Sequence, residues 1–447
     1  MGRQLNRRQF VKSAALSLAS LSASRGLAAS RPRKPRSPNE KLNIALIGIL
    51  GRGQANAQGV QGENFYALCD IDERNYAKFI EKFPDAEKAK RENDWRRLLD
   101  DQNIDAVVIS TADQVHALGC VKAMQMGMHV YCEKPLAHSV HEARRVREVY
   151  RKCRGKVATQ MGTQIHATDN FRRVVELVQS GAIGPVREAH VWCSRTITPL
   201  EPLEGTHEIP EYLEWDLWLG PAPYRPYHPG YLPGNLNWNR RWEFGNGVLG
   251  DMGSHLIDLP WWALKLSKPQ SVYAEGPKPD PVNNPEWMIA TWEHAPRRGN
   301  PVLRVPVTVK WYHGGQDWAY RPKVETGVDL TKWFNGILFV GDNGMLLADY
   351  GKRMLLPEEK FKDFQPPEQT IPASPGHYAE WIEAAKTGGE ALCNFEYSGS
   401  LIEHNLLGNV AFRVGEELEW DAKRLKARNC PEADAFIRRE YREGWTI

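Results

Sequence analysis

The chain has 447 residues, enough for two or three domains with large cores, which excludes a peptide, a minidomain or a disulfide-stapled scaffold. Hydrophobic residues make up 42% and charged residues 25%, without a long apolar run, which argues against a transmembrane protein. The 58 Lys and Arg against 55 Asp and Glu give a net charge of +3, too small an excess for a protein that binds nucleic acid.

The N-terminal segment carries only positive charges, and Glu40 is the first acid. The motif Arg-Arg-Gln-Phe-Val-Lys at residues 7–12 precedes a weakly apolar run at 14–23 and a stretch of small residues. This pattern resembles a twin-arginine export signal, the alternatives being a disordered basic arm or an amphipathic helix. We expect a signal peptide at 1–29, a basic Pro-rich linker at 30–40, and a periplasmic or otherwise exported protein.

The seven cysteines contain no CxxC pair, so the sequence predicts no zinc site. Export by the twin-arginine route follows folding in the cytoplasm, where thiols stay reduced. Cys69 and Cys132 also lie at the ends of apolar, strand-like runs. We therefore expect free buried thiols, no metal, and a protein that can carry a cytoplasmic cofactor outward already bound.

The segment that follows the linker has the order strand, glycine-rich turn, helix, strand and acid. An apolar run at 42–47 predicts a buried parallel strand, and a second run at 64–68 ends just before Asp70. Glycine in the turn lets backbone amides approach a pyrophosphate, and a carboxylate can bind ribose hydroxyls. The candidate turn contacts are Gly48, Leu50, Gly51, Arg52 and Gly53.

The acid after the second strand also bears on the choice of cofactor. A carboxylate at Asp70 repels a 2′-phosphate and so favours NAD over NADP. Arg52 or Arg74 could offset that repulsion, so NADP remains the alternative.

Two further strands are predicted at 104–110 and 127–132, with a helix at 115–126 between them. Glu133, Lys134 and Pro135 follow the second of these strands. Ligands bind beyond the carboxyl ends of strands in open parallel sheets, so Lys134 is a candidate catalytic group. A solvated surface lysine is the alternative.

Tryptophan is abundant, with 16 in the chain and seven of them between residues 192 and 262. Indole faces stack on the C–H faces of sugar rings, although most tryptophans belong to cores or interfaces. Trp238 and Trp242 stand among asparagines and arginines and are the candidates for a pocket.

Asp251 and His255 are four residues apart in an apolar stretch at 249–264 with helical spacing, which places both on one face. A carboxylate and an imidazole on one face can orient a diol and move a proton. The alternative is an acid near a helix start beside a core histidine.

From about residue 160 the alternation of strands and helices stops. Strand-like runs predict an antiparallel sheet at 186–192, 271–274, 288–292, 305–312 and 336–340. Pro-rich segments at 199–233 and 364–375 predict long ordered loops. We expect an α/β protein: a Rossmann domain with a doubly wound parallel sheet at 41–160, and an α+β domain with a large open, mainly antiparallel sheet at 161–447.

Several of these segments together resemble the Gfo/Idh/MocA oxidoreductases, the family of glucose–fructose oxidoreductase and inositol dehydrogenase. The matching segments are the Gly48 turn, Ser110 to His116, Glu133 to Pro135, Gln160 to Gln164, Gly250 to His255 and Leu406 to Asn409. The resemblance extends from about residue 41 to the C-terminus. The chain departs from the family at Ala112, usually Pro, and at Val115, often aromatic, both near the expected nicotinamide.

The resemblance implies roles for the candidate residues. Alcohol oxidation needs an acceptor for the hydroxyl proton and a group that stabilises the developing alkoxide. His255 is the expected general acid/base, Lys134 polarises the alcohol oxygen and Asp251 holds the substrate, although Lys134 and His255 can exchange roles. The cofactor contacts would come from the turn residues and Asp70, together with Ser110, Thr111, His116, Glu133, Lys134 and Gln160.

Other assignments leave alternatives open. His116 is as readily a helix cap or a packing residue, and Gln160 and Gln164, which could contact substrate, are as readily polar ends of strands. Gln164, Trp238 and Trp242 are the candidate substrate contacts. The family resemblance further implies that the C-terminal sheet covers the nicotinamide and forms a homo-oligomer interface.

The sequence thus predicts an exported NAD-dependent oxidoreductase that moves a hydride to or from a ring hydroxyl of a sugar, glycoside or cyclitol. No free nicotinamide pool is expected outside the cytoplasm, so the cofactor would be tightly held. One alternative is an NAD-dependent glycoside hydrolase that uses transient C3 oxidation and elimination, although the chain lacks the Tyr-Pro-Thr-His-Gly segment of its best-known exported branch. Another is a non-catalytic sugar-binding protein.

Overall fold

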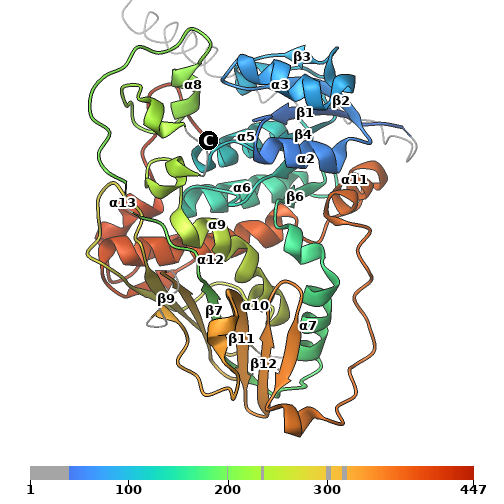
Figure 1. Ribbon diagram of the computed structural model, residues 1–447, viewed down its shortest axis with the longest axis vertical. Coiled ribbons are helices and arrows are strands. Elements are labelled where there is room, and N and C mark those ends of the chain that lie inside the picture. The colour runs from blue at the N-terminus through green and yellow to red at the C-terminus, as the bar shows by residue number, and fades with distance from the viewer. Residues whose placement is uncertain (1–39, 199, 233–235, 298–303, 315–319) are drawn as a thin grey trace, which may run out of the picture. The chain divides into compact units, whose positions relative to one another are not determined.

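A computed structural model describes residues 40–198, 200–232, 236–297, 304–314 and 320–447 (Figure 1). The predicted signal peptide and nearly all of the linker lie outside the described residues. Within the described ranges, no helix is both long and apolar enough to cross a membrane.

The N-terminal sheet consists of six parallel strands in the order β3-β2-β1-β4-β5-β6, which confirms the predicted doubly wound sheet. Its strands are β1 (Asn43–Ile47), β2 (Asn64–Cys69), β3 (Lys90–Arg91), β4 (Ala106–Ile109), β5 (His129–Cys132) and β6 (Thr159–Met161). All four residues of β4 are buried, as expected for a strand covered on both faces. The expected domain boundary at residue 160 falls within β6.

Helices follow these strands as right-handed crossovers require. They are α2 (Arg52–Val60), α3 (Arg74–Lys82), η1 (Pro84–Ala86), α4 (Trp95–Leu98), α5 (Asp113–Gln125) and α6 (Val140–Cys153). The start of α6 has a capping box, because the Ser139 side chain accepts from the backbone of Glu142 while the Glu142 side chain accepts from the backbone of Ser139. This cap fixes the chain directly after the loop that contains Lys134.

The C-terminal sheet has nine strands in the order β13-β12-β11-β7-β10-β9-β8-β14-β15. They are β7 (Val186–Cys193), β8 (Ser271–Glu275), β9 (Met288–His294), β10 (Val307–His313), β11 (Asn335–Gly341), β12 (Gly344–Ala348), β13 (Arg353–Leu356), β14 (Leu418–Asp421) and β15 (Lys426–Ala427). Among the described strands of this second sheet, only β7 and β10 pair in parallel. The predicted mainly antiparallel sheet is therefore confirmed.

The helices and short 3-10 turns of the second half complete the fold. They are η2 (Gln164–Ala167), α7 (Asp169–Gln179), α8 (Trp215–Leu219), η3 (Pro229–Tyr231), η4 (Asn237–Arg240), α9 (Gly247–Leu256), α10 (Asp258–Ala263), η7 (Leu330–Lys332), η8 (Glu358–Phe361), α11 (His377–Thr387), α12 (Phe395–Val414), η9 (Pro431–Ala433) and α13 (Asp434–Ile437). The apolar stretch at 249–264 therefore forms two helices rather than one, divided at Ile257.

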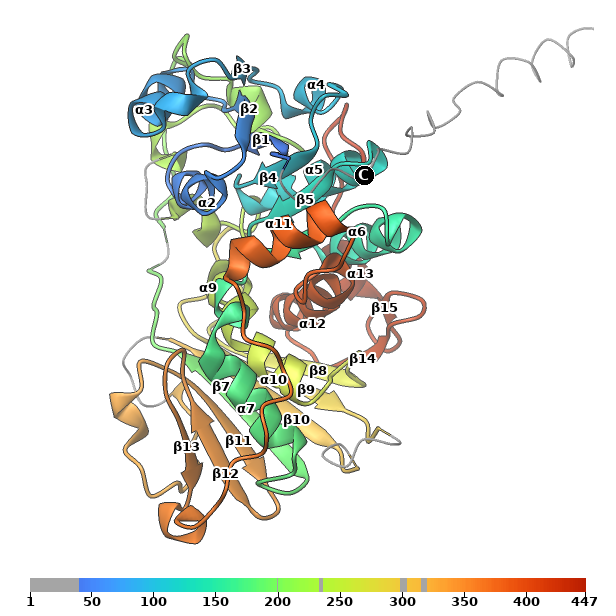
Figure 2. The ribbon, with the colours of Figure 1, turned by 90° about the vertical axis from the view of Figure 1, so that its right-hand side faces the viewer.

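The long helix α12 lies between the two sheets (Figure 2). It packs against α6 on the side of the parallel sheet, and against α9 and β8 on the other side. Fifteen of its residues are buried, so the helix is covered on nearly every face. One continuous hydrophobic core therefore joins the parallel sheet to the mixed sheet.

The opposite face of the mixed sheet is only partly covered. Leu330 and Trp333 from the segment before β11 pack over Trp192 and neighbouring apolar side chains of that face. The uncovered part presents polar residues, among them Thr291, Thr308 and Lys310, beside a shallow hollow. The homo-oligomer through this sheet stays a prediction, and the chain itself already covers part of the expected interface.

Helix α11 returns from the C-terminal half to the parallel sheet and packs against α2. The hydroxyl of Tyr378 donates to Asn56 Oδ1 at 2.8 Å, and its ring stacks on that of Tyr131. All seven cysteines are free, and all but the half-buried Cys153 are buried, which confirms the prediction of reduced thiols.

Candidate active site

The glycine-rich turn brings three backbone segments unusually close together. A Cβ added at Gly48 would lie 2.7 Å from the Ser110 carbonyl oxygen, and one added at Gly53 would lie 1.9 Å from the Gly48 oxygen. Gly51 has φ of 57° and open space where its side chain would be. The N-terminus of α2 is therefore bare of side chains at this turn and fits a dinucleotide pyrophosphate.

Asp70 fastens this turn to the end of β2. Its Oδ2 accepts a hydrogen bond from the Ile49 amide at 3.1 Å, and its Oδ1 accepts from the Asp72 amide and from Asn75 Nδ2. Burial raises the pKa of Asp70, against those hydrogen bonds. The carboxylate thus lies at the crevice where the ribose is expected, and its role as a ribose ligand stays a prediction.

The two cations that could have favoured NADP are both occupied. Arg52 forms an ion pair with Glu133 at 2.8 Å, and Arg74 forms one with Asp72 at 2.7 Å. Each guanidinium already has a carboxylate partner in this structure, which favours NAD.

Lys134 and Asp251 form a buried ion pair that joins the two halves of the structure. Lys134 follows β5, Asp251 lies in α9, and their side chains are 17% and 7% exposed. The guanidinium of Arg195, which follows β7, pairs with the other oxygen of Asp251. Burial opposes both charges, but the attraction to Lys134 and Arg195 lowers the pKa of Asp251, and Asp251 and Glu133 raise that of Lys134.

His255 lies one helical turn beyond Asp251 in α9. Its Nδ1 is buried and has no hydrogen-bond partner among the described residues. Burial and the positive charge of Lys134 lower the pKa of His255 to about 4. The imidazole is therefore neutral near pH 7 and can accept a proton.

Asp113 is a further acid of the site, at the start of α5. Its Oδ2 accepts from the backbone amide and the side-chain amide of Asn246, both at 3.2 Å. Burial raises the pKa of Asp113 to about 8, although Lys134 and Asn246 oppose the shift. Sequence reasoning assigned no role to Asp113, but its position directly after β4, at the sheet edge that carries Lys134, was a signal that could have found it.

A pocket of about 60 Å³ brings most of the predicted residues together. Predicted residues that line it are Arg52, Ser110, Thr111, Glu133, Lys134, Trp238 and Asp251, and those not predicted are Asp113, Pro135, Leu236 and Asn239. Cofactor and catalytic candidates from both halves of the chain therefore share one space. The half-buried Trp238, on η4, lines this pocket, and its contact with a substrate stays a prediction.

His116 and Trp242 do not line this pocket. His116 is buried, and its two ring nitrogens lie 2.7 Å from the Pro135 oxygen and 3.0 Å from the Thr111 oxygen. The ring therefore links the loops that follow β5 and β4. The Trp242 indole is buried and donates to the Asp280 carbonyl at 3.1 Å. The expected contact of His116 with the cofactor and that of Trp242 with the substrate stay predictions.

The two glutamines lie behind the pocket. Gln160 is buried and donates to the His377 carbonyl at 2.5 Å. Gln164 donates to the Tyr131 hydroxyl at 2.9 Å and to Glu133 at 3.2 Å. Neither glutamine lines the pocket, and their expected contacts with cofactor and substrate stay predictions.

Arg195 and Tyr350 are functional candidates that the sequence did not indicate. Arg195 pairs with Asp251, and the buried hydroxyl of Tyr350 has no hydrogen-bond partner among the described residues. Burial and the negative charge of Asp251 both contribute to raising the pKa of Tyr350. Arg195 comes three residues after a predicted strand, whereas Tyr350 lies in a turn with no recognisable pattern.

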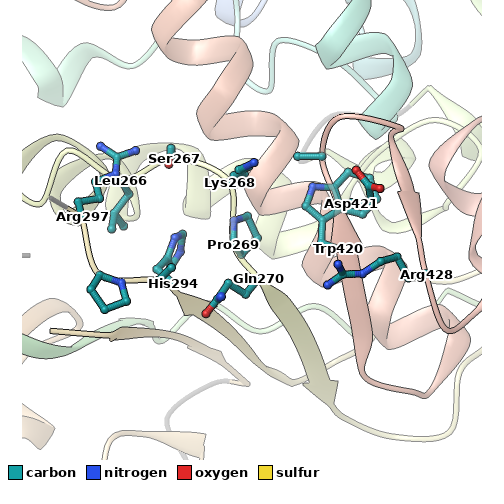
Figure 3. A pocket seen from close by; sticks show the side chains of 13 residues that line it. Leu266, Ser267, Lys268, Pro269, Gln270, His294, Arg297, Trp420, Asp421 and Arg428 are labelled. Carbon is teal, nitrogen blue, oxygen red and sulfur yellow. The ribbon is translucent and has the colours of Figure 1, made fainter.

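A much roomier hollow lies elsewhere, between the turn before β8 and the β14–β15 pair (Figure 3). It measures about 370 Å³ and is lined by Lys268, Arg297 and Trp420 among others, but by no predicted site residue. Size alone therefore does not identify the candidate site. Across the described ranges, no three His, Cys, Asp or Glu side chains are grouped to hold a metal.

Two family models match the chain. Residues 42–161 match the Gfo/Idh/MocA oxidoreductase family, NAD-binding Rossmann fold, and residues 190–294 match the C-terminal alpha/beta domain of that family. The matched regions contain the glycine turn, Lys134, Asp251 and His255.

Curated relatives include dehydrogenases of cyclitols and sugars. Inositol 2-dehydrogenase of Salmonella typhimurium is 30% identical over 34% of this chain and 44% of its own length. Levoglucosan dehydrogenase of Pseudarthrobacter phenanthrenivorans is 24% identical over 49% of this chain and 50% of its own. A glycosyl hydrolase family 109 protein of Shewanella pealeana is 27% identical over 40% of this chain and 44% of its own length. The chain spans half or less of these relatives.

Solved structures share the fold over most of the chain. Levoglucosan dehydrogenase in complex with NADH and levoglucosan has a TM-score of 0.56 and 16% identity, covering 85% of this chain and 99% of that one. The WlbA dehydrogenase of Bordetella pertussis, in complex with NADH and UDP-GlcNAcA, has a TM-score of 0.59 and 15% identity, covering 86% and 99%. At this identity the likeness establishes the fold.

The raised pKa of Asp113 predicts a pH dependence of stability. The folded carboxyl keeps its proton up to about pH 8, whereas the unfolded one loses it near pH 4. The contribution of protonated Asp113 to the free energy of unfolding is therefore full below about pH 4 and is lost as the pH rises through about 8. Between about pH 6 and pH 8.5, Asp113→Asn should gain about 2 kcal/mol of unfolding free energy relative to the parent, measured by urea titration. The exposed Asp85→Asn is the control. A constant difference between Asp113→Asn and the parent would show that Asp113 is ionised.

Proposed function

Because the chain belongs to the Gfo/Idh/MocA oxidoreductase family, we propose that it is an NAD-dependent dehydrogenase acting on a ring hydroxyl of a sugar, glycoside or cyclitol. One observation carries the proposal: the Lys134 and Asp251 ion pair lines the same pocket as Arg52 of the glycine turn, and neutral His255 lies one helical turn beyond Asp251. NAD, when bound, supplies the hydride acceptor.

The charges assign the roles of the chain's own groups. Lys134 stays protonated and can donate a hydrogen bond to the alcohol oxygen, which stabilises the alkoxide as it develops. His255 is neutral, so its imidazole can take the hydroxyl proton when substrate is bound. This charge distribution favours His255 as the base and Lys134 as the polarising group over the exchanged roles.

Asp251 and Arg195 can hold the substrate. A carboxylate such as Asp251 accepts hydrogen bonds from two neighbouring hydroxyls, which suits a diol. Arg195 is 44% exposed, so its guanidinium can turn toward an incoming polar ring without leaving Asp251 bare, since Lys134 remains paired. Trp238 provides an apolar face beside them for the ring's C–H bonds.

Replacement of the lysine tests the assignment. Lys134→Met keeps the length of the side chain but removes the charge, and should lower kcat for sugar or cyclitol oxidation by roughly 10² to 10⁴ while NADH binding, followed by fluorescence, persists. Lys332→Met, at a side chain 80% exposed, is the control. Unchanged turnover of Lys134→Met would favour the non-catalytic sugar-binding alternative.

A hydrolytic outcome is the second candidate, because one relative is named a glycosyl hydrolase family 109 protein. Transient oxidation at C3 acidifies the C2 proton and permits elimination of the glycosidic group. In D₂O, elimination requires deuterium at C2 of the released sugar, whereas net hydride transfer leaves C2 unlabelled. We expect no label, read by NMR of the product; a labelled C2 would replace the dehydrogenase proposal with the hydrolase.

Export with the cofactor already bound is the remaining part of the proposal, and the twin-arginine pattern at residues 7–12 supports it. Cell fractionation should find the parent outside the cytoplasm, and the Arg7→Lys, Arg8→Lys double variant inside it. Denaturation of the exported protein should release close to one NAD per chain, measured by mass spectrometry. An exported protein that is empty, and that gains no thermal stability from NAD, would contradict tight binding.

A further inference from the structure

A second hollow, of about 50 Å³, lies behind the candidate active site. Its walls come from the start of α6, from the last turns of α12, and from α13. Its lining residues include Asn246, which also faces the site through its hydrogen bonds to Asp113. Asn246 therefore lies between the hollow and the site. None of the functions predicted above is assigned to the hollow.

Arg413 brings an unbalanced charge to this hollow. Its guanidinium lies over the rings of Phe436, at 4.1 Å, and Trp242, at 4.9 Å. No carboxylate in the described part of the chain pairs with it, and burial lowers the pKa of Arg413 to about 10. A guanidinium withdrawn from water without an anion is unfavourable, so the site lacks a negative partner.

Other polar groups of the lining are also unsatisfied. Arg439 binds Glu142 and the Gln114 carbonyl through Nε and Nη2, but its buried Nη1 has no hydrogen-bond partner among the described residues. Both ring nitrogens of His138 are buried without a hydrogen bond of good geometry, and the ring's contact is with the Trp242 backbone. Burial and the charges of Arg439 and Arg413 lower the pKa of His138 well below its usual value, so its ring is neutral and offers one donor and one acceptor.

We infer that this hollow binds a small oxyanion, held by Arg413, Arg439 and His138. One water needs about 10 to 15 Å³ of such space, so the hollow has room for roughly three to five atoms, the size of a carboxylate, bicarbonate or phosphate group. Arginine donors match the oxygens of such groups in pairs. A protonated oxyanion, such as bicarbonate or hydrogen phosphate, also satisfies both nitrogens of a neutral His138.

An anion bound in the hollow would affect helix α9, which carries two residues of the candidate active site. Asn409 lines the hollow and its side chain donates to the Asn246 carbonyl at 3.1 Å. Asn246 directly precedes α9, which carries Asp251 and His255. An anion here therefore stabilises the chain at the point where α9 begins, without touching the substrate.

Thermal unfolding of the full chain with excess NAD tests the site, since NAD prevents phosphate from acting at the glycine turn. Sodium phosphate, bicarbonate or acetate should raise the Tm of the parent by roughly 2 to 5 °C over chloride of equal ionic strength. Arg413→Gln should lose this rise, and Arg424→Gln, at an arginine 71% exposed, should keep it. A rise with any one of the three anions supports the site and identifies its class.

The opposing explanation is that the two aromatic rings alone stabilise Arg413. It predicts that Arg413→Gln is destabilised in chloride and that phosphate, bicarbonate and acetate leave the parent unchanged, which would overturn the inference. An equal rise in the parent and both variants would overturn it too. Should Arg413→Gln not fold, His138→Leu keeps the arginine between its rings, and titration calorimetry should show at least tenfold weaker anion binding than in the parent.

Discussion

The ion pair of Lys134 and Asp251 is the interaction on which the site depends, because it connects the end of a strand in one sheet to a helix packed on the other. Two charges can stay buried only if each neutralises the other and further donors are near. Arg195 and Glu133 supply those further charges. Burial, together with the positive charge of Lys134, lowers the pKa of His255 and keeps its ring neutral.

That arrangement needs the two sheets held in fixed positions, which is the contribution of α12. Its buried surface packs on α6, which starts just after the Lys134 loop, and on α9, which carries Asp251. At the same end, Asn246 links the start of α9 to Asp113 on one side and to Asn409 of α12 on the other. Packing and hydrogen bonds thus place the charged groups together.

Local patterns predicted the parts whose physics is local. The glycine turn, Asp70, Lys134 and the Asp251 and His255 pair follow from strand ends and helical spacing. In the structure, Lys134, Asp251 and Arg52 of the glycine turn line one pocket. Asp70 and His255 do not line it. Arg195 was not found because its place depends on the pairing of β7 with β10 and β11, which are distant in sequence, and Tyr350 lies in a turn without a readable pattern. Trp242 has the composition of a pocket residue, yet tertiary packing buries it beside Phe412 and Arg413. Two-residue strands such as β3 and β15 carry no periodicity to read.

The return of α11 to α2 has a consequence for the order in which the molecule is completed. Tyr378 meets Asn56 across 322 positions of the chain, and Lys386 meets Glu63 across 323. The parallel strands can pair while the ribosome is still making the second half, but the outer surface of α2 waits for residues near the end of synthesis. The dinucleotide crevice is therefore among the last regions to be finished, although its glycines are among the first residues of the fold to emerge.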